Sequence, residues 1–387
     1  MLALRLARGS HPLVLLRRLS VTAAAAGTGF LLLSTVGHAA GHPSAADESL
    51  VRLLWCAAPL AATAQFAVST ARTDPAARLQ RGMTAAGLGP LRLTLLATAS
   101  TALTCFLGVL LSLLVFFRLR GDLGRPSSLG IDADLLGAGH PVPLVGALML
   151  LATVPLTAAA ATAVSLRPRD EAGSPETGTR PRTAPPSGLP WGIALAAAGL
   201  AIEAYTSRGA HAAGGLLPLP GRLVGSPPGV LAGWALSAFG LVLAGPGLVH
   251  LCGRLLCAGR PGALRLLSGR VLQEESHRLG RPLGVLCAVG SAAYAAVKVY
   301  EASPSRPFGP LTAVGAAVVL ACVTASALTA ALESRSARAH TTAALRRLGA
   351  SASVLHRAAA LRFLALVLVL APLTWTVAEM ATLPLVH

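Results

Sequence analysis

Long apolar runs alternate with short polar stretches along the whole chain. Each run holds about 20 residues with few charges, the length that a helix needs to cross the hydrocarbon core of a bilayer. The pattern therefore predicts an all-α polytopic membrane protein. About nine such runs predict membrane-spanning helices, at 19–37, 51–70, 92–117, 143–166, 189–205, 229–251, 283–300, 310–332 and 361–384.

The arginines of the polar stretches predict the orientation of the chain in the membrane. Basic residues gather in the short loops on the cytoplasmic side of membrane proteins. If the N-terminus lies inside, every internal stretch holds at least four arginines and no external stretch holds more than three. The N-terminus is therefore expected inside the cell and the C-terminus outside.

Composition agrees with a membrane protein. Only 12% of the residues are charged and 54% are hydrophobic, whereas soluble domains carry about 25% charged residues. In a soluble protein, the net charge of +17 would suggest nucleic acid as a partner. Here the arginines flank apolar runs, so membrane topology and anionic lipid headgroups account for them better. Membrane lipids are expected partners, and nucleic acid is not.

The polar stretches divide the chain into parts. Residues 1–166 are expected to form an N-terminal membrane repeat with spans 1–4, and residues 189–251 a middle helix pair, spans 5 and 6. Residues 167–188 are rich in Pro, Gly, Ser and Thr and predict a disordered cytoplasmic linker. Residues 252–282 are expected to be a basic cytoplasmic loop, and residues 283–387 hold spans 7–9 in a C-terminal repeat.

Two polar stretches, residues 72–89 and 333–350, resemble each other and predict two cytoplasmic hinges. Each follows an apolar run, carries several arginines, contains a glycine near its end and leads into another apolar run. Such a segment suits docking of a partner protein. The candidate partner-binding residues are Arg72, Arg78, Arg81 and Gly87 in the first hinge and Glu333, Arg335, Arg338, Arg346, Arg347 and Gly349 in the second.

The hinges also indicate an internal repeat. Arg18 lies just before the first span and Arg281 just before the seventh. The number of residues between these two arginines nearly equals the number between Gly87 and Gly349. Spans 1–3 are therefore expected to recur as spans 7–9 in a parallel repeat, related by a pseudo-two-fold axis along the membrane normal. The alternative is chance similarity between two segments rich in Ala and Leu. Two matching hinges on one face suggest a partner that is itself a pair.

The second hinge carries a resemblance to a known family. That family has a pattern of Glu-Arg, Leu-Arg and Leu-Gly-Ala-Ser. The residues of this chain that match it are Glu333, Arg335, Arg338, Leu345, Arg346, Leu348, Gly349, Ala350 and Ser351. In this segment the chain resembles the FtsX/MacB-like permease family, the membrane subunits of mechanotransmitting ABC transporters. The match is fainter at 72–92, where the glutamate is missing. The order of spans resembles the family's ten-span branch, with the tenth span absent.

The resemblance implies a permease of the bacterial cell membrane that is moved by a separate ABC-type ATPase, present in two copies. The large external domain of many family members is reduced to short loops here, so the resemblance gives no substrate. No Gly-x-x-x-x-Gly-Lys-[Ser/Thr] motif occurs, and the single lysine, Lys298, lies at the end of a span. No other catalytic motif occurs, so the chain itself is not expected to be an enzyme or to need a cofactor.

No metal site is expected either. The six cysteines show no zinc-binding spacing. His38 and His42 lie near two acidic residues and are the best candidate ligands, but Gly41 and Pro43 favour a polar loop over a helix that holds both on one face.

Three ionisable residues, Glu203, Lys298 and Glu379, lie within or at the edge of predicted spans. A charge at the centre of a membrane helix costs about 2.5–3.5 kcal/mol on insertion scales, so such residues are candidates for a functional role. All three lie near a predicted span end, which favours the alternative that they reach the membrane surface. Lys298 and Glu301 are expected to pair across one helical turn.

Three functions fit these patterns. The leading hypothesis is the transmembrane subunit of an ABC transporter, with its ATPase docked on residues 72–89 and 333–350. A proton-coupled secondary transporter is the second, with Glu203 or Glu379 as the proton carrier, and a non-transporting membrane scaffold is the third. Co-purification of an ATPase distinguishes the first from the others, and sensitivity of uptake to a proton uncoupler identifies the second.

The predicted orientation can be tested with single cysteines at positions 80, 344 and 301, in a variant without the native cysteines. Gln80→Cys and Ala344→Cys lie in the predicted cytoplasmic hinges, so a membrane-impermeant maleimide should label them only after the cells are opened. Glu301→Cys lies in a predicted external loop and should be labelled in intact cells. Labelling of position 80 or 344 from outside would exclude both hinges as cytoplasmic docking sites.

Overall fold

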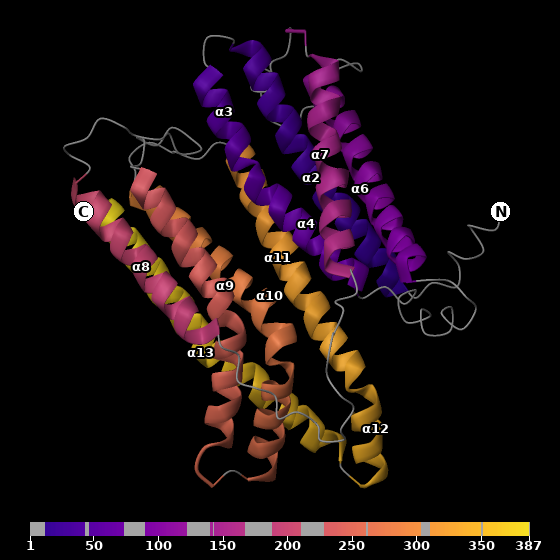
Figure 1. Cartoon of the computed structure of the whole chain (residues 1–387), viewed down its shortest axis with the longest axis vertical. Coiled ribbons are helices and arrows are strands. Elements are labelled where there is room, and N and C mark those ends of the chain that lie inside the picture. Colours follow the sequence, from indigo (N-terminus) through magenta and orange to yellow (C-terminus); the bar gives the residue numbers. More distant parts are fainter. Residues whose placement is uncertain are drawn as a thin grey trace, which may run out of the picture. The chain divides into compact units, whose positions relative to one another are not determined.

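The computed structural model describes residues 12–42, 46–72, 90–121, 140–141, 143–166, 188–209, 228–260, 262–302, 310–349 and 351–386. These residues are almost entirely helical (Figure 1). The helices are α2 (Pro12–Gly41), α3 (Ala46–Trp55), α4 (Ala57–Arg72), α6 (Pro90–Arg120), α7 (Leu144–Leu166), α8 (Gly188–Gly209), α9 (Pro228–Cys257), α10 (Ala263–Ala302), α11 (Pro310–Ala337), α12 (Ala339–Arg347) and α13 (Ala352–Val386).

Nine helical segments of the described residues are long and apolar enough to cross a membrane. The second of them combines most of α3 with α4, and each of the others corresponds to one long helix. The expectation of an all-helical, multi-pass membrane protein is thus confirmed. Its orientation and the internal repeat stay predictions.

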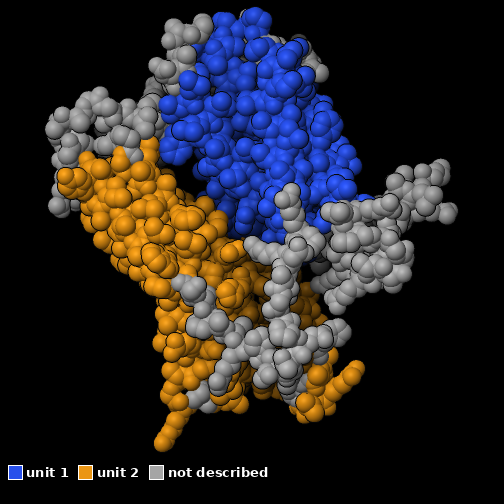
Figure 2. Space-filling model, viewed as in Figure 1, with its two compact units in different colours: residues 1–173, 308–326 blue, residues 174–307, 327–387 orange. Residues whose placement is uncertain are grey.

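Two compact units make up the chain (Figure 2). Unit 1 contains residues 1–173 and 308–326, and unit 2 contains residues 174–307 and 327–387. The boundary between them divides α11, which is one uninterrupted helix, so that its first part belongs to unit 1 and its last part to unit 2. The packing within each unit is described separately below.

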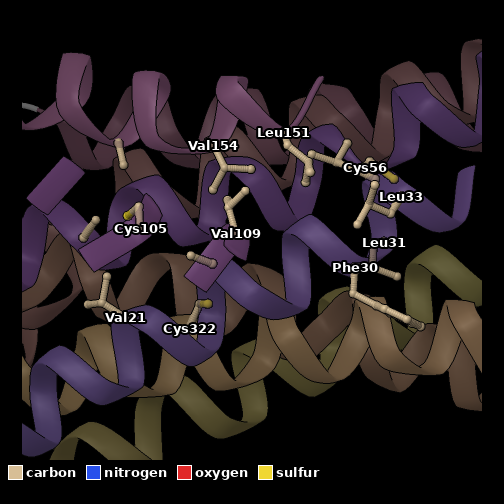
Figure 3. Close-up of a cluster of buried hydrophobic side chains, with 14 of the residues drawn as sticks. Val21, Phe30, Leu31, Leu33, Cys56, Cys105, Val109, Leu151, Val154 and Cys322 are labelled. Carbon is tan, nitrogen blue, oxygen red and sulfur yellow. The ribbon is translucent and has the colours of Figure 1, made fainter. Parts of the chain in front are cut away.

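Unit 1 is held by a core of interlocking apolar side chains (Figure 3). Side chains from α2, α4, α6, α7 and the first part of α11 meet there. Phe30 and Phe116 pack edge to face with ring centres 6.4 Å apart, an arrangement that the charge distribution of aromatic rings favours. Thr28 and Thr63 satisfy each other by a 2.8 Å hydrogen bond between their hydroxyls. These two buried hydroxyls are therefore paired, as burial requires.

Unit 2 is held by direct contact between helix backbones at glycines. Gly192 and Gly240 face each other across α8 and α9, and a Cβ added to either would lie 2.7 Å from the other's carbonyl oxygen. Gly199 and Gly233 form the next such pair, at 2.6 and 2.7 Å. These contacts are tighter than any side chain permits. Small residues at helix contacts are how membrane helices approach closely, so α8 and α9 are packed as a glycine-lined pair.

The predicted basic loop at 252–282 is wrong. α9 continues to Cys257 and α10 begins at Ala263, so the connection is short. Gly253 and Gly269 face each other as a third glycine pair, at 2.7 and 2.6 Å, and extend the close packing into this region. The arginines there lower the hydropathy, but Leu, Arg, Gln and Glu are good helix formers. Hydropathy predicts where a chain leaves the membrane, but it does not predict where a helix ends.

The length of α10 has a geometric consequence. Its 40 residues span about 60 Å at 1.5 Å per residue, roughly twice the thickness of the hydrocarbon core. Part of α10 must therefore extend beyond the membrane, and its arginine-rich first half is the more polar part. A small buried cluster of Val249, Cys252 and Leu272 joins α9 to α10 in this region. The Ser268 hydroxyl also donates a hydrogen bond to the Ala358 carbonyl of α13, at 3.1 Å.

The expected polar loop around His38 is also wrong. α2 runs to Gly41, and the His42 backbone N–H donates to the His38 carbonyl in a continuation of the helical pattern. The two imidazole rings consequently stack, with centres 4.4 Å apart. Among the residues that the structure describes, no group of three potential metal ligands is found.

Gly199→Ala should destabilise unit 2 by about 1–3 kcal/mol, because the added methyl group meets backbone that cannot move aside. The change can be measured by thermal unfolding of the purified protein in detergent. Gly146→Ala on α7 is the matched control, since its added Cβ would find its nearest neighbour, Pro143 Cβ, 4.0 Å away. Equal unfolding temperatures for both variants would contradict the assigned role of the glycine contact.

Candidate partner-docking site

The second predicted hinge is a short helix between two long ones. α11 ends at Ala337, α12 follows after the single residue Arg338, and α13 begins at Ala352. Gly349 ends the segment with φ +93°, and its N–H donates to the Arg346 carbonyl at 3.0 Å. Apart from its chain neighbours, no atom of the described residues lies within 4 Å of a Cβ added there. The backbone conformation, not lack of space, is thus the reason for glycine after this helix.

The end of α12 is strongly exposed. Arg346 and Arg347 are exposed, and 85% of the Leu348 side-chain surface is accessible. The two guanidinium groups lie in the last turn of α12, where positive charge is favoured by the helix dipole. Single exposed apolar residues are common on protein surfaces. A leucine beside two exposed arginines nevertheless provides both parts of a docking surface, an apolar anchor and charges that direct binding.

Arg338 has a different environment from the other arginines of the hinge. Its Nε lies 2.8 Å from Oε1 of Glu275 on α10, and the side chains of Arg338 and Glu275 are only 22% and 11% exposed. Its guanidinium also donates to the carbonyl and hydroxyl oxygens of Ser334, at 3.1 and 3.2 Å. Arg338 therefore holds the junction of α11 and α12 against α10 and does not lie on the exposed surface with Arg346 and Arg347.

Glu275 is the residue of this site that the sequence did not reveal. Glu274 and Glu275 are the two acids of the stretch 252–282, which holds six arginines, and this imbalance was the available signal. Glu274 is exposed whereas Glu275 is buried. Only the packing of α10 distinguishes these neighbours.

The remaining predicted docking residues have separate positions. Arg335 is exposed near the end of α11, and Glu333 is half-buried on the same helix. Arg72 is exposed at the end of α4. Arg78, Arg81 and Gly87, the rest of the first hinge, lie outside the described residues. The second hinge is therefore the one whose geometry can be examined.

Two of the predicted intramembrane charges meet aromatic hydrogen-bond donors in unit 2. The Trp234 indole N–H donates to Oε1 of Glu203 at 2.6 Å, and the Tyr294 hydroxyl donates to Oε1 of Glu379 at 2.7 Å. Glu203 is only 1% exposed. The expected exposure of Glu203 is wrong, because its carboxyl group is enclosed where α8 packs on α9. Its position near the end of a span agrees with the sequence.

Lys298 interacts with an aromatic ring. Its ammonium group lies 5.7 Å from the centre of the Tyr294 ring, within the range of a cation–π contact. No ion pair between Lys298 and Glu301 is found in the described part of the chain, where the Glu301 side chain is exposed. The expected pairing across one turn is thus replaced by contact with the tyrosine one turn earlier.

No protein-family model, curated protein or solved structure matches this chain. The inference of a docking surface therefore depends on the geometry and the residues of the second hinge alone.

Glu275→Ala should lower the stability of the purified protein by about 1–3 kcal/mol, since it leaves the Arg338 guanidinium without its charged acceptor. Glu274→Ala, on the exposed neighbour, is the matched control and should leave stability unchanged. Thermal unfolding of Arg338→Ala and of the double variant Arg338→Ala/Glu275→Ala completes the cycle. If the losses of stability in the two single variants add up to the loss in the double variant, the two side chains do not stabilise each other.

Proposed function

We propose that this chain is the transmembrane subunit of an ABC transporter of the FtsX/MacB-like type, moved by a separate ATPase that docks on α12. The observation that carries the proposal is the exposed basic end of α12, between two helices long enough to cross the membrane. A partner bound to Arg346, Arg347 and Leu348 would hold the chain segment that connects α11 to α13. Its movement would then act on both helices.

The ion pair between Arg338 and Glu275 supports this mechanical role. Packed helices shift as rigid bodies when a partner pulls on one of them. Because Arg338 joins the α11–α12 junction to α10 at 2.8 Å, a displacement of α12 is carried to a third helix. α10 also packs on α9 and α13. The hinge is thus attached to the helix bundle of unit 2 by more than its two chain connections.

The packing within each unit supports a second docking point. α2 packs on α6 in unit 1, and α10 packs on α13 in unit 2. These are the pairs that correspond if spans 1–3 recur as spans 7–9. In that arrangement the stretch 72–89, which holds Arg72, Arg78, Arg81 and Gly87, corresponds to the second hinge. The proposal therefore includes two ATPase copies, one at each hinge, on the cytoplasmic face of a bacterial cell membrane.

The resemblance of residues 333–351 to the permease family supports an ATPase as the partner, and the sequence lacks a P-loop of its own. Exposed arginines complement an acidic protein surface, which increases the rate and specificity of association. The same arginines suit anionic lipid headgroups. Binding of a protein and binding of lipid are distinguished by the experiment below.

The test is purification of the tagged chain from the membranes of its own host, with ATP hydrolysis and mass spectrometry as readouts. We expect an ATPase to co-purify. Arg346→Glu/Arg347→Glu should weaken its binding by about tenfold or more, because like charges that face each other across an interface cost several kcal/mol. The matched control is Arg346→Lys/Arg347→Lys, which retains both charges and should retain most of the binding.

Full binding of the ATPase to the glutamate variant would show that α12 is not its docking site. If no ATPase accompanies the wild-type chain, the proposal fails as a whole. Uptake that depends on the proton gradient and not on ATP would favour a secondary transporter. The unfolding temperature of each variant, measured in detergent, separates lost docking from lost folding.

A further inference from the structure

Glu203 occupies an unusual position for a carboxyl group. It lies on α8, and its side chain is 1% exposed even without surrounding lipid. Oε1 accepts the hydrogen bond from Trp234 on α9 at 2.6 Å. Oε2 is buried and has no hydrogen-bond partner. One carboxyl oxygen is therefore satisfied by a neutral donor and the other is not satisfied.

This geometry favours the protonated over the ionised carboxyl group. An ionised carboxylate is an acceptor at both oxygens and needs several donors or a nearby cation when it is buried. Glu203 forms no ion pair within the described residues, and Trp234 contributes a single neutral N–H. A protonated carboxyl group has no net charge, keeps its carbonyl oxygen as the acceptor for Trp234, and carries its hydrogen on the other oxygen. Oε2 is thus the atom at which the proton fits.

α9 and α13 pack on α8. No ion pair of Glu203 is found among the described side chains; the side chain of Arg208, five positions further along α8, lies outside them. On α13 the charged or titratable residues are His356, Arg357, Arg362 and Glu379, and Oε1 of Glu379 accepts a hydrogen bond from Tyr294 of α10. On α9 the titratable residues begin sixteen positions beyond Trp234, about 24 Å along the helix. They are His250, Cys252, Arg254 and Cys257.

The Glu203 carboxyl group is enclosed where α8 packs on α9. Gly199 and Gly233 bring the two backbones into contact one turn away from Glu203. A Cβ added to Gly233 would lie 3.1 Å from both the backbone N and the Cβ of Glu203. The glutamate therefore sits directly against the α9 backbone, and a hydrated carboxylate would require the helices to move apart.

We propose that Glu203 is a proton-binding site within the α8–α9 pair, which holds its proton on Oε2 at neutral pH and releases it only when the two helices separate at this end. The ligand is the proton itself, and the site consists of Glu203, the Trp234 indole and the glycine contact. Release transfers the proton to water that enters the separated interface, and the carboxylate remains. The proposal goes beyond the proposed function and does not depend on any ATPase.

Infrared spectroscopy of the purified full-length protein at neutral pH tests the site. The carbonyl stretch of a protonated carboxylic acid lies at higher frequency than the stretches of a carboxylate. The difference spectrum between wild type and Glu203→Gln should show the loss of an acid band. Glu301→Gln, on an exposed acid of α10, is the matched control and should show the loss of carboxylate bands. Loss of carboxylate bands from Glu203→Gln would overturn the proposal.

A second variant keeps the test decisive if Glu203→Gln does not fold. Trp234→Phe removes the hydrogen bond to Oε1, so the acid band of Glu203 should persist and move to higher frequency. An unmoved band would show that it does not arise from Glu203. Transfer into D2O tests enclosure, because the acid band should shift slowly, at the rate at which α8 and α9 open. An immediate and complete shift would overturn release by helix separation.

Discussion

Direct contact between glycine backbones is the constraint on which unit 2 depends. Lipid tails are as apolar as the side chains of a membrane helix, so the hydrophobic effect gives helices little reason to associate within the bilayer. Gly199 against Gly233 and Gly253 against Gly269 bring α8, α9 and α10 close enough for extensive backbone packing. Unit 1 combines interlocking side chains such as Phe30 and Phe116 with a glycine contact of its own, Gly108 of α6 against the Thr22 carbonyl of α2. Glycines therefore bring helices together in both units, and unit 2 has more of these contacts in matched pairs.

Two polar interactions in unit 2 depend on this close packing, and they differ in kind. Arg338 and Glu275 are oppositely charged, partly accessible and satisfied by each other. Glu203 is enclosed, meets only the neutral Trp234 donor, and has one carboxyl oxygen without a partner. An ion pair at a helix junction fixes the relative position of helices. An enclosed carboxyl group instead makes the position of its helices depend on whether it carries a charge.

These two interactions also place the proposed docking surface and the proposed proton site in one compact unit. The hinge α12 joins α11 to α13, and Arg338 connects it to α10, which packs on α9. α9 in turn carries Trp234, the partner of Glu203. A continuous series of packed helices therefore runs from the proposed docking surface to the proposed proton site. Coupling between the two sites would further require an element with two arrangements that both sites favour differently.

The sequence by itself determined which parts of the chain enter the membrane and where the second hinge turns. Apolar runs such as 143–166 have the length of a span whatever surrounds them, and Gly349 marks a left-handed turn that other residues disfavour. These are local properties. The extension of α10 over 263–302 escaped prediction because hydropathy measures partition into lipid, while a helix continues wherever its residues favour one and neighbours cover them.

Only the tertiary structure decided the roles of individual charges. Glu274 and Glu275 are adjacent and chemically identical, yet the rotation of α10 exposes one and turns the other to Arg338. Glu203 lies near a span end, where sequence favoured exposure, but Gly233 on another helix lets α9 cover it. Both outcomes depend on residues far away in the chain. The environment of a charge is set by what packs against it, and local sequence contains no record of that.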